Sequence, residues 1–403
     1  MSVSLAKSPV ATLTASGTLG AFLTAVKAAG AAIPARVPVP VLAGCMIAVS
    51  DGAVTVSGYN YETAAVALVD GATGTDGGAV LVHCKMLADM LTAAGKRATK
   101  RVTDAWPVTI VQDGANVRVD VNGMSYTLAA MDAAEYPALP ALESEESVTV
   151  DAAEFIRRMD SAMVSASKDD TLPILTAIRM EFSAGNLDVL ATDRYRLTLG
   201  TLPFATALGS AGSLEANFLL RAATWKSFKR HLSPKGSPIE IRFYAATTAD
   251  HRVSLAFVQD GATLHTLGVD GDYPRIRSLF PDSTPITFEV SADALAAAVA
   301  SVAVTAERNT PVKLTYNGLD SLRVQAGTGE SATAEAFLPY VGTDGNRGFA
   351  VAFNPAYLAD VLKDLKGQTI EICHTTAPKP AMIRGTESAA VKHLIMPVRM
   401  PNE

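Results

Sequence analysis

The sequence predicts an α+β fold of three similar domains, each with two helices packed against antiparallel sheets. One observation is a proline that stands directly before an apolar strand at Pro40, Pro173 and Pro311. The intervals between these prolines are 133 residues (40 to 173) and 138 residues (173 to 311). Each repeat also contains two amphipathic helix patterns, and the first two end near a Tyr-Pro corner, at 136–137 and 273–274. Repetition at this spacing indicates three copies of one structural unit.

The length of the chain agrees with this organisation. A chain of 403 residues holds two or three domains of ordinary size. We expect the domains to span residues 1–146, 147–284 and 285–403, with linkers near 138–146 and 275–285.

Each repeat is expected to open with a strand followed by an amphipathic helix. Apolar residues three and four positions apart place one apolar stripe on each helix. Asp151 with Glu154 has the spacing of a capping box, and Ser291 can cap the third of these helices. The stripes are Leu19, Phe22, Leu23 and Val26; Phe155, Ile156, Met159 and Met163; and Leu295, Val299 and Val302.

A second helix is expected later in each repeat. In the third repeat Asn354 stands at the cap position and Pro355 at the first helical position, where a proline is tolerated. The apolar faces are Met86, Leu87, Met90 and Leu91; Trp225, Phe228 and Leu232; and Tyr357, Leu358, Val361, Leu362 and Leu365.

The centre of the chain reads as three strands in sequence. Alternating apolar residues predict strands over 174–182, 187–190 and 195–199, with a turn at 183–186 and a polar corner at 192–194. Elsewhere the dipeptides Asn122-Gly123 and Asp260-Gly261 predict tight hairpin turns.

Composition limits the class of protein. Apolar residues make up 49% of the chain, but none of its segments is long and apolar enough to cross a membrane, and residues 1–12 lack a signal-peptide core. The three cysteines, Cys45, Cys84 and Cys373, are far apart, which favours reduced thiols in a cytoplasmic protein. With a net charge of −6, any DNA-binding face must be local.

The sequence offers little support for catalysis or metal binding. The six histidines form no metal-spaced pair, and no glycine-rich phosphate loop follows a strand. Asp193 and Arg194 could be imagined as active-site groups, but without a nucleophile or metal nearby a turn or buried ion pair is the better interpretation. We expect neither a catalytic residue, a metal nor a cofactor.

Cations gather on or beside the predicted helices. The segment 221–231 carries Arg221, Lys226, Lys229 and Arg230 without an acid, and Arg157, Arg158 and Lys168 lie on or beyond another helix. A third cluster is Lys85, Lys96, Arg97, Lys100 and Arg101. Each could be an ordinary solvated face, but in an acidic chain their recurrence favours a shared surface that contacts phosphates.

Three segments resemble one known family. LPILTAIRMEF (172–182) and LATDRYRLTLG (190–200) are similar to the middle domain of the bacterial sliding clamp, the beta subunit of DNA polymerase III. HLIMPVRM (393–400) is similar to the run that closes clamps of this family. The resemblance covers almost the whole chain and implies a ring formed by a head-to-tail homodimer.

The resemblance also implies a function without chemistry. The ring would encircle duplex DNA, independently of its sequence, as a processivity factor in a DNA polymerase holoenzyme. It would tether the DNA polymerase III alpha subunit, the clamp loader and repair polymerases through short linear motifs with glutamine, leucine and phenylalanine. The location implied is the cytoplasm, in association with the nucleoid.

Site residues follow from the same resemblance. The dimer interface would include Tyr126 and Val304. The DNA-facing residues would be Arg36, Arg157, Arg158, Arg221, Lys226, Lys229 and Arg230. The partner-peptide groove would be formed by Leu175, Thr192, Tyr195, Arg196, Leu197, Pro274, Leu279, Leu394, Met396, Pro397, Val398, Arg399 and Met400.

Two alternatives remain open at the level of sequence. One is a second clamp copy with the same fold, borne by a phage or protecting its host against a clamp-binding inhibitor. The other is a repeated α+β hydrolase or transferase. The chain departs from the family pattern at Met400, where leucine is usual, at Ser278, where many clamps have a basic residue, and in the tail 401–403. Ser278 and the tail leave the strength of partner binding open, while Met400 is a mild change of shape.

Overall fold

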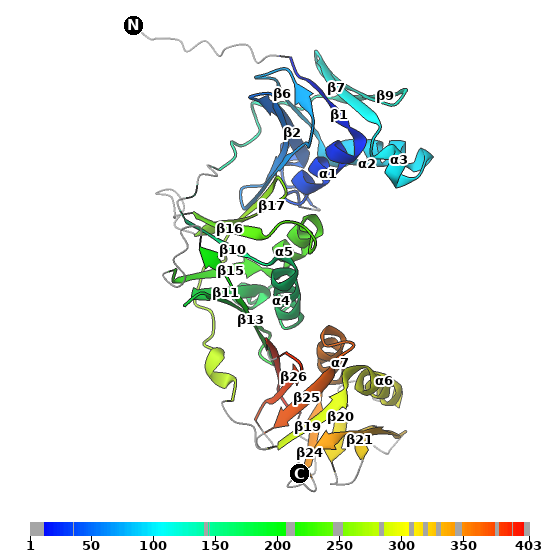
Figure 1. Ribbon diagram of the computed structural model, residues 1–403, viewed down its shortest axis with the longest axis vertical. Coiled ribbons are helices and arrows are strands. Elements are labelled where there is room, and N and C mark those ends of the chain that lie inside the picture. The colour runs from blue at the N-terminus through cyan, green and yellow to red at the C-terminus, as the bar shows by residue number, and fades with distance from the viewer. Residues whose placement is uncertain are drawn as a thin grey trace. The chain divides into compact units, whose positions relative to one another are not determined.

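A computed structural model describes most of the chain (Figure 1). The described residues are 12–34, 36–140, 144, 146–206, 214–244, 253–281, 286–305, 310–316, 321–327, 332–342, 349–374, 379–388 and 390–398. They fall into two compact units, which are described separately. Unit 1 comprises Met1–Ala153, Thr206–Gly209 and Ala223–Gly268, and unit 2 comprises Glu154–Ala205, Ser210–Ala222 and Val269–Glu403.

Unit 1 contains two antiparallel sheets. The smaller sheet has the strand order β5 (Thr73–Gly74), β1 (Thr14–Thr18), β7 (Pro107–Asp113), β8 (Asn116–Val121) and β9 (Met124–Ala129). Within this unit the larger sheet runs β10 (Glu146–Val150), β16 (Ile239–Tyr244), β17 (Ser254–Gln259), β18 (Ala262–Leu267), β4 (Thr63–Leu68), β3 (Ala53–Tyr59), β2 (Gly44–Ser50) and β6 (Ala79–His83).

The helices of unit 1 bury most of the predicted stripes, but Met86, expected on the apolar face of the second helix, is 48% exposed. α1 (Leu19–Gly30) packs on α2 (Cys84–Ala94), and Phe22 and Leu91 are fully buried between the sheets and helices. Thr18 caps α1 by accepting a hydrogen bond from the Ala21 amide at 3.3 Å. The short α3 (Lys100–Thr103) follows α2, and α5 (Ala222–Phe228) buries Trp225 and Phe228 against Phe257.

Unit 2 also contains two antiparallel sheets. The larger sheet runs β15 (Ala216–Arg221), β11 (Ala177–Ser183), β12 (Asn186–Thr192), β13 (Arg196–Pro203), β27 (Val391–Ile395), β26 (Ala381–Gly385), β25 (Thr369–His374), β19 (Ile286–Ser291) and β23 (Val341–Gly342). The smaller runs β22 (Ala334–Pro339), β21 (Ser321–Ala326), β20 (Val312–Tyr316) and β24 (Phe349–Phe353). The helices are α4 (Ala152–Val164), α6 (Ala292–Val302) and α7 (Pro355–Asp364).

Predictions that depend on local chemistry are confirmed. Ser291 accepts a hydrogen bond from Ala294 at the start of α6, and Asn354 caps α7 just before Pro355. The turns Asn122-Gly123 and Asp260-Gly261 have positive φ at both residues, 44° and 82° and then 48° and 80°, as a two-residue hairpin requires.

Two predicted boundaries are wrong. The strand expected from residue 174 begins at Ala177, because Pro173 opens a 3-10 turn over Pro173–Thr176. The helix expected to reach Leu232 ends at Phe228 and continues as a 3-10 turn over Lys229–His231. In both cases the apolar residue expected in the core, Leu175 or Leu232, is buried, but the backbone is wound more tightly.

Each larger sheet contains one strand pair that joins two sequence repeats. In unit 1, β4 pairs with β18, and Thr63 lies opposite Thr266; we call this strand pair the first junction. In unit 2, β13 pairs with β27, and Arg196 lies opposite Ile395; this strand pair is the second junction. Just beyond each pair one further backbone bond forms, from Leu267 to Glu62 at the first junction and from Met396 to Tyr195 at the second. The two junctions are therefore in the same register.

The three cysteines are free and buried. Over the part of the chain that is described, none of the helices combines the length and hydropathy needed to span a bilayer. Within the same residues, His, Cys, Asp and Glu side chains form no group of three that could hold a metal ion.

Candidate functional site

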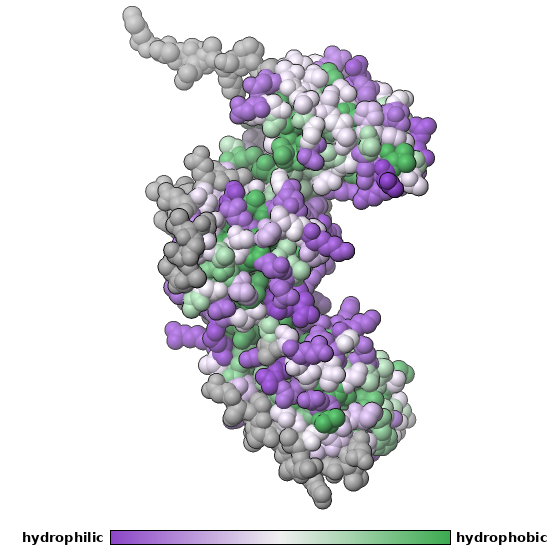
Figure 2. Space-filling model, viewed as in Figure 1, coloured by the Kyte–Doolittle hydropathy of each residue, from purple (hydrophilic) through white to green (hydrophobic). Residues whose placement is uncertain are grey.

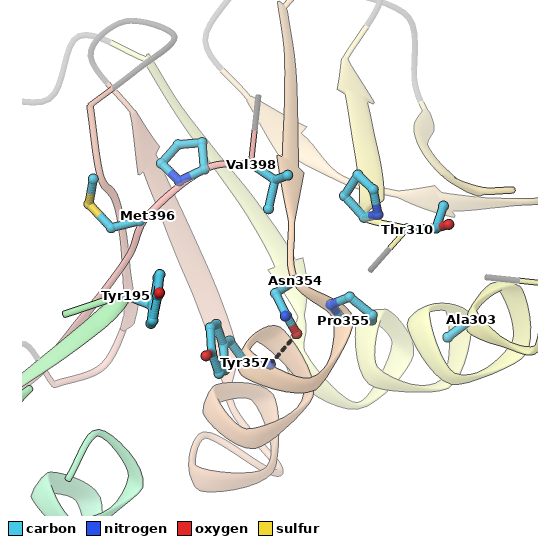
Figure 3. A pocket seen from close by; sticks show the side chains of 10 residues that line it. Tyr195, Ala303, Thr310, Asn354, Pro355, Tyr357, Met396 and Val398 are labelled. Carbon is cyan, nitrogen blue, oxygen red and sulfur yellow. Dashed lines mark hydrogen bonds between the residues drawn. The ribbon is translucent and has the colours of Figure 1, made fainter. Parts of the chain in front are cut away.

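An open pocket of about 610 Å³ lies beside the second junction in unit 2 (Figure 3). Its walls come from the turn before β13, the end of α6, the segment before β20, the start of α7 and the chain after β27. The lining residues are Tyr195, Ala303, Thr310, Pro311, Asn354, Pro355, Tyr357, Met396, Pro397 and Val398.

A tight turn presents Tyr195 to this pocket. Asp193 Oδ1 accepts hydrogen bonds from the amides of Tyr195 (3.0 Å) and Arg196 (2.9 Å), so the carboxylate closes an Asx turn. Thr192 Oγ1 accepts from the Arg194 amide at 3.1 Å, and Arg194 has a φ of 79°, which is unusual for a residue with a side chain. The turn leaves the Tyr195 side chain 53% exposed.

Arg196 supports the pocket from beneath. Its Nε donates to Asp193 Oδ2 at 3.0 Å and its Nη1 donates to Asp360 Oδ2 at 2.7 Å. Its guanidinium carbon lies 4.7 Å from the ring centroid of Tyr357, within cation–π range. The bonds to Asp193 and Asp360 fix α7 to the turn. Because the Arg196 side chain is only 6% exposed, its charge is little available to a ligand.

Two tyrosines form one wall of the pocket, with apolar rings and polar hydroxyl groups at their edges. The rings of Tyr195 and Tyr357 stack with centroids 5.8 Å apart and an interplanar angle of 25°. Figure 3 shows them facing one another beneath Met396. Burial raises the pKa of Tyr357, with Asp193 adding to the effect, so its hydroxyl is neutral and can donate a hydrogen bond.

The chain after β27 forms the opposite wall. The Met396 amide donates to the Tyr195 carbonyl at 2.8 Å, and the Val398 amide donates to the Ala352 carbonyl at 2.8 Å. These two bonds hold Met396 and Val398 in place while their side chains stay 37% and 36% exposed. Apolar side chains that remain exposed on a fixed backbone suit the binding of an apolar partner.

Beneath the turn lies an apolar cluster joined to the linker. Tyr273 accepts a hydrogen bond from the Thr192 amide at 3.0 Å and donates to the Ala177 carbonyl at 3.4 Å. Burial raises the pKa of this hydroxyl well above its usual value. The buried members of the cluster are Leu190, Leu197, Tyr273, Ile276, Cys373, Met382 and Leu394.

The structure separates the expected groove residues into groups. Tyr195, Met396, Pro397 and Val398 line the pocket, as described. Leu175, Thr192, Arg196, Leu197 and Leu394 are buried and act as its support, whereas Pro274 and Leu279 are exposed on the linker. Arg399 and Met400 lie outside the described residues.

Sequence reasoning missed part of the pocket. Tyr357, Asn354 and Pro355 were assigned only to a helix start and an apolar stripe, although a tyrosine in the first turn of an amphipathic helix is a signal for an exposed aromatic edge. Ala303, Thr310 and Pro311 carry no comparable signal.

Among the expected DNA-facing residues, Arg158 is an exception. It lies on the buried side of α4, three residues after Phe155, and is 4% exposed. Its Nε donates to the Thr201 carbonyl at 3.2 Å and its guanidinium also contacts Glu154. Burial lowers the pKa of this guanidinium. The structure therefore does not support a DNA-facing role for Arg158.

The other expected cations are accessible. Arg36, Arg157, Arg221, Lys226 and Arg230 are exposed, and Lys229 is half-buried. Burial lowers the pKa of His231, and the neighbouring charges of Arg230 and Lys27 lower it further, which indicates a locally positive potential beside α5. Figure 2 shows hydrophilic side chains over the helices α4 and α5.

The expected interface residues lie at or near the edges of sheets. Tyr126 is on β9, the last strand of the smaller sheet of unit 1. Val304 follows α6 and is 84% exposed. Phe337, which sequence reasoning missed, is 61% exposed on β22, the outer strand of the smaller sheet of unit 2. Open strand edges with exposed apolar side chains are typical of surfaces that pair with another chain.

Family models match almost the whole chain. They are the DNA polymerase III beta subunit N-terminal domain over residues 19–140, its central domain over 149–275 and its C-terminal domain over 277–399.

Curated relatives carry the corresponding name. The chain is 35% identical to the beta sliding clamp of Micrococcus luteus over 78% of this chain and 95% of the relative. It is 30% identical to the beta sliding clamp of Streptomyces coelicolor over 93% and 96%, respectively. It is 28% identical to the beta sliding clamp homolog GriR of Streptomyces muensis over 90% and 93%.

Solved structures share the fold. The DNA polymerase III beta subunit of Thermotoga maritima superposes with a TM-score of 0.82 at 20% identity, covering 96% of this chain and all of that one. The sliding clamp of Pseudomonas aeruginosa bound to griselimycin gives a TM-score of 0.82 at 18% identity, covering 97% and 100%.

Proposed function

The chain belongs to the DNA polymerase III beta subunit family, the beta sliding clamps, and we propose that it is a DNA sliding clamp. In this role it is a ring-shaped processivity factor that encircles duplex DNA and tethers the replicative polymerase. The observation that carries the proposal is the match of all three beta-subunit domain models, in order, along one chain.

The proposed role requires no chemistry from this chain. The clamp acts as a topological tether in a polymerase holoenzyme, and it needs neither a metal nor a cofactor for that purpose. We place it in the cytoplasm, in association with the nucleoid, because that is where the DNA to be encircled lies.

We infer that DNA contacts are weak, sequence-independent and made to phosphates. Support comes from the exposed cations of α5 and its flanks and from the positive potential beside His231. Replacing Lys226, Lys229 and Arg230 together by glutamine should weaken binding equally for all sequences. The salt dependence should fall by roughly one unit of slope per lost phosphate contact.

A matched control carries the same change in net charge. Arg179, Arg242 and Arg384 each form an ion pair on a strand, so their replacement by glutamine should leave the salt slope of DNA binding unchanged. Equal salt slopes for the two triple variants would show that the α5 cations are merely solvated.

We infer that the ring is a head-to-tail homodimer. A head-to-tail contact would bring the β9 edge with Tyr126 to the edge that carries Val304 and Phe337 in a second copy. Val304→Asp places a charge at an 84% exposed apolar position and should shift the protein toward monomer in sedimentation experiments. Val253→Asp, at a position 47% exposed in unit 1, is the control. A monodisperse monomer for the unaltered chain would contradict the ring.

We infer that the pocket beside the second junction binds short linear motifs of partner proteins. The partners proposed are the DNA polymerase III alpha subunit, the clamp loader and repair polymerases. Exposed Met396, Val398 and the stacked tyrosines can accommodate leucine and phenylalanine anchors. Because methionine side chains adapt their shape, one pocket can serve several partners.

A second clamp copy is the alternative that a specific observation favours. The relatives include both beta sliding clamps and the beta sliding clamp homolog GriR, at 28% identity. A second copy would have the same fold, and deletion of the gene without loss of viability would favour it over the housekeeping clamp.

One experiment tests the proposed function as a whole. The protein is assembled by a clamp loader on nicked circular plasmid, separated from free protein, and followed after the plasmid is linearised. A clamp stays on the closed circle and slides off the linear form. Equal retention on both forms would indicate ordinary DNA binding and contradict the proposal.

A further inference from the structure

A chain of buried polar side chains crosses the second junction. The hydroxyls of Ser165 and Thr198 lie 2.7 Å apart, Thr198 Oγ1 lies 2.8 Å from His393 Nδ1, and His393 Nε2 lies 3.0 Å from Asp364 Oδ2. Ser165, Thr198 and His393 are 0% exposed. The four residues come from the end of α4, from β13, from β27 and from the end of α7.

The carboxylate fixes the direction of the last hydrogen bond in this series, and a neutral imidazole would then fix the other two. A carboxylate only accepts, so His393 Nε2 carries a hydrogen and donates it to Asp364. In the neutral imidazole Nδ1 then accepts from the Thr198 hydroxyl, whose oxygen in turn accepts from Ser165. The buried Nε2–H of His393 has its acceptor only while Asp364, and therefore α7, stays in place.

Catalysis does not explain the arrangement. A hydroxyl, an imidazole and a carboxylate in this order resemble a hydrolytic triad. Because Thr198 and His393 are fully buried, a substrate has no access to the hydroxyl.

The same face of α7 builds the pocket. Tyr357, Asp360 and Asp364 follow one another at spacings of three and four residues, so they share one side of the helix. Tyr357 stacks on Tyr195, Asp360 pairs with Arg196 and Asp364 pairs with His393. One face of α7 therefore carries both a wall of the pocket and Asp364, the last member of the buried hydrogen-bonded series.

The first junction shows that the fold does not need this series of hydrogen-bonded side chains. In the shared register, Thr198 and His393 lie opposite each other on β13 and β27, and Ala65 and Leu264 lie opposite each other on β4 and β18. Ala65 and Leu264 are also fully buried. At this position an apolar pair stands at the first junction where the polar pair Thr198 and His393 stands at the second.

We propose that His393, with Thr198, Ser165 and Asp364, is a positioning network for the partner pocket. It holds α7 at the rotation and height that place Tyr357 against Tyr195. The proposal rests on the proposed function, because it assumes that this pocket binds the partner motif. A geometric specification of this kind is a better-supported use of buried polar groups than added stability.

The first test replaces the network by apolar groups. The variant Ser165→Ala, Thr198→Val and His393→Leu resembles the first junction and leaves Asp364 able to reach water. It should fold with a melting temperature close to that of the unaltered chain, while binding of a synthetic peptide with Gln, Leu and Phe anchors weakens about tenfold.

The second test uses one position and two variants. Asp364→Asn keeps an oxygen that accepts from His393 and should retain peptide affinity within about twofold, since only the charge is lost. Asp364→Leu has a similar size and no acceptor, so its affinity should fall about tenfold. Lys363→Leu, exposed on the neighbouring face of α7, is the control and should bind normally.

Hydrogen exchange of residues 355–364 separates this proposal from the proposed pocket. Faster exchange in Asp364→Leu but not in Asp364→Asn supports the positioning role, even if the peptide binds elsewhere. If the unaltered chain bound no peptide, the proposed pocket would be overturned. Unchanged exchange and unchanged affinity in both the apolar variant and Asp364→Leu would overturn the positioning role.

Discussion

The first and second junctions have the same backbone geometry but differ in their side chains. At the first, Asn60 Oδ1 accepts from the amides two and three residues ahead, as Asp193 does at the second. The residue after each acceptor has a positive φ, 74° at Tyr61 and 79° at Arg194. Repetition of the sequence unit therefore extends to single hydrogen bonds.

The corner tyrosines repeat in the same way. Tyr136 accepts from the Tyr59 amide at 2.7 Å and donates to the Gly44 carbonyl at 3.4 Å. Tyr273 accepts from the Thr192 amide and donates to the Ala177 carbonyl. Burial raises the pKa of Tyr136 to about 12, so its hydroxyl stays protonated and can donate. Both turns are thus anchored from below by a buried phenol.

What differs is a small set of side chains, some exposed and some buried. Glu62 and Thr63 stand at the first junction where Tyr195 and Arg196 stand at the second. The sixth residue of α5, Ser227, donates to the Ala31 carbonyl, whereas the sixth residue of α7, Asp360, holds Arg196. The comparison teaches that the fold supplies two equivalent frames with different side chains, and the pocket described above lies beside the second.

The largest expected effect is the loss of the second junction's outer wall. Truncation after Ile395 removes Met396, Pro397 and Val398 and should abolish binding of the partner peptide in fluorescence anisotropy, since their side chains line the pocket. The dimer should persist, because β27 ends at Ile395. Removal of residues 401–403 alone is the control and should change affinity little. Undiminished binding by the longer truncation, with the dimer intact, would place the peptide elsewhere.

The next effect concerns the buried cation of the second junction. Arg196→Met leaves Asp193 and Asp360 without their partner and should lower the free energy of unfolding by about 3 kcal/mol. Thr63→Ala, at the equivalent position of the first junction, removes the hydroxyl whose single hydrogen has the Ala32 carbonyl and Asn60 Oδ1 as alternative acceptors, and should cost about 1 kcal/mol. Urea denaturation measures both, and equal losses would remove the energetic distinction between the junctions.

Local chemistry explains which parts of the fold could be predicted from sequence. Helix caps, hairpin turns and the Tyr-Pro corners depend on residues a few positions apart, and the described structure confirms Ser291, Asn354 and the two hairpin turns. A proline before a strand was read correctly as a repeat marker, although Pro173 turned out to open a 3-10 turn.

Long-range partners explain what could not be predicted. Arg196 meets Asp360, which is 164 positions away, and His393 meets Thr198, 195 positions away. Neither pairing leaves a periodic signal in the sequence. Arg158 is a different case, because its position three residues after Phe155 is a local signal for the buried side of α4 that the charge pattern obscured.

A smaller effect, dependent on pH, distinguishes the first junction. Burial lowers the pKa of His265 from 6.5 to about 4, and in the shared register its counterpart at the second junction is Leu394. Because the folded state disfavours the proton, the stability contributed by neutral His265 is complete above pH 6.5. This stability is lost as pH falls from about 6.5 to about 4, and the loss at pH 5 is about 2 kcal/mol.

His265→Leu copies the second junction and isolates this effect. The variant should lose less stability than the unaltered chain between pH 7 and pH 5 when thermal or urea unfolding is compared. The other buried histidines remain in both proteins, so their contributions cancel. Parallel pH profiles for the two proteins would mean that His265 is accessible to protons in the folded state.

The most direct test of the account asks which junction the partner peptide covers. Hydrogen exchange with and without a synthetic peptide carrying Gln, Leu and Phe anchors should show protection at 193–197, 354–360 and 394–398. The equivalent segments of the first junction, 60–64, 221–227 and 265–269, should exchange at unchanged rates, with one peptide bound per chain. Protection of the first junction, or two peptides per chain, would contradict the proposal that the partner peptide binds at the second junction.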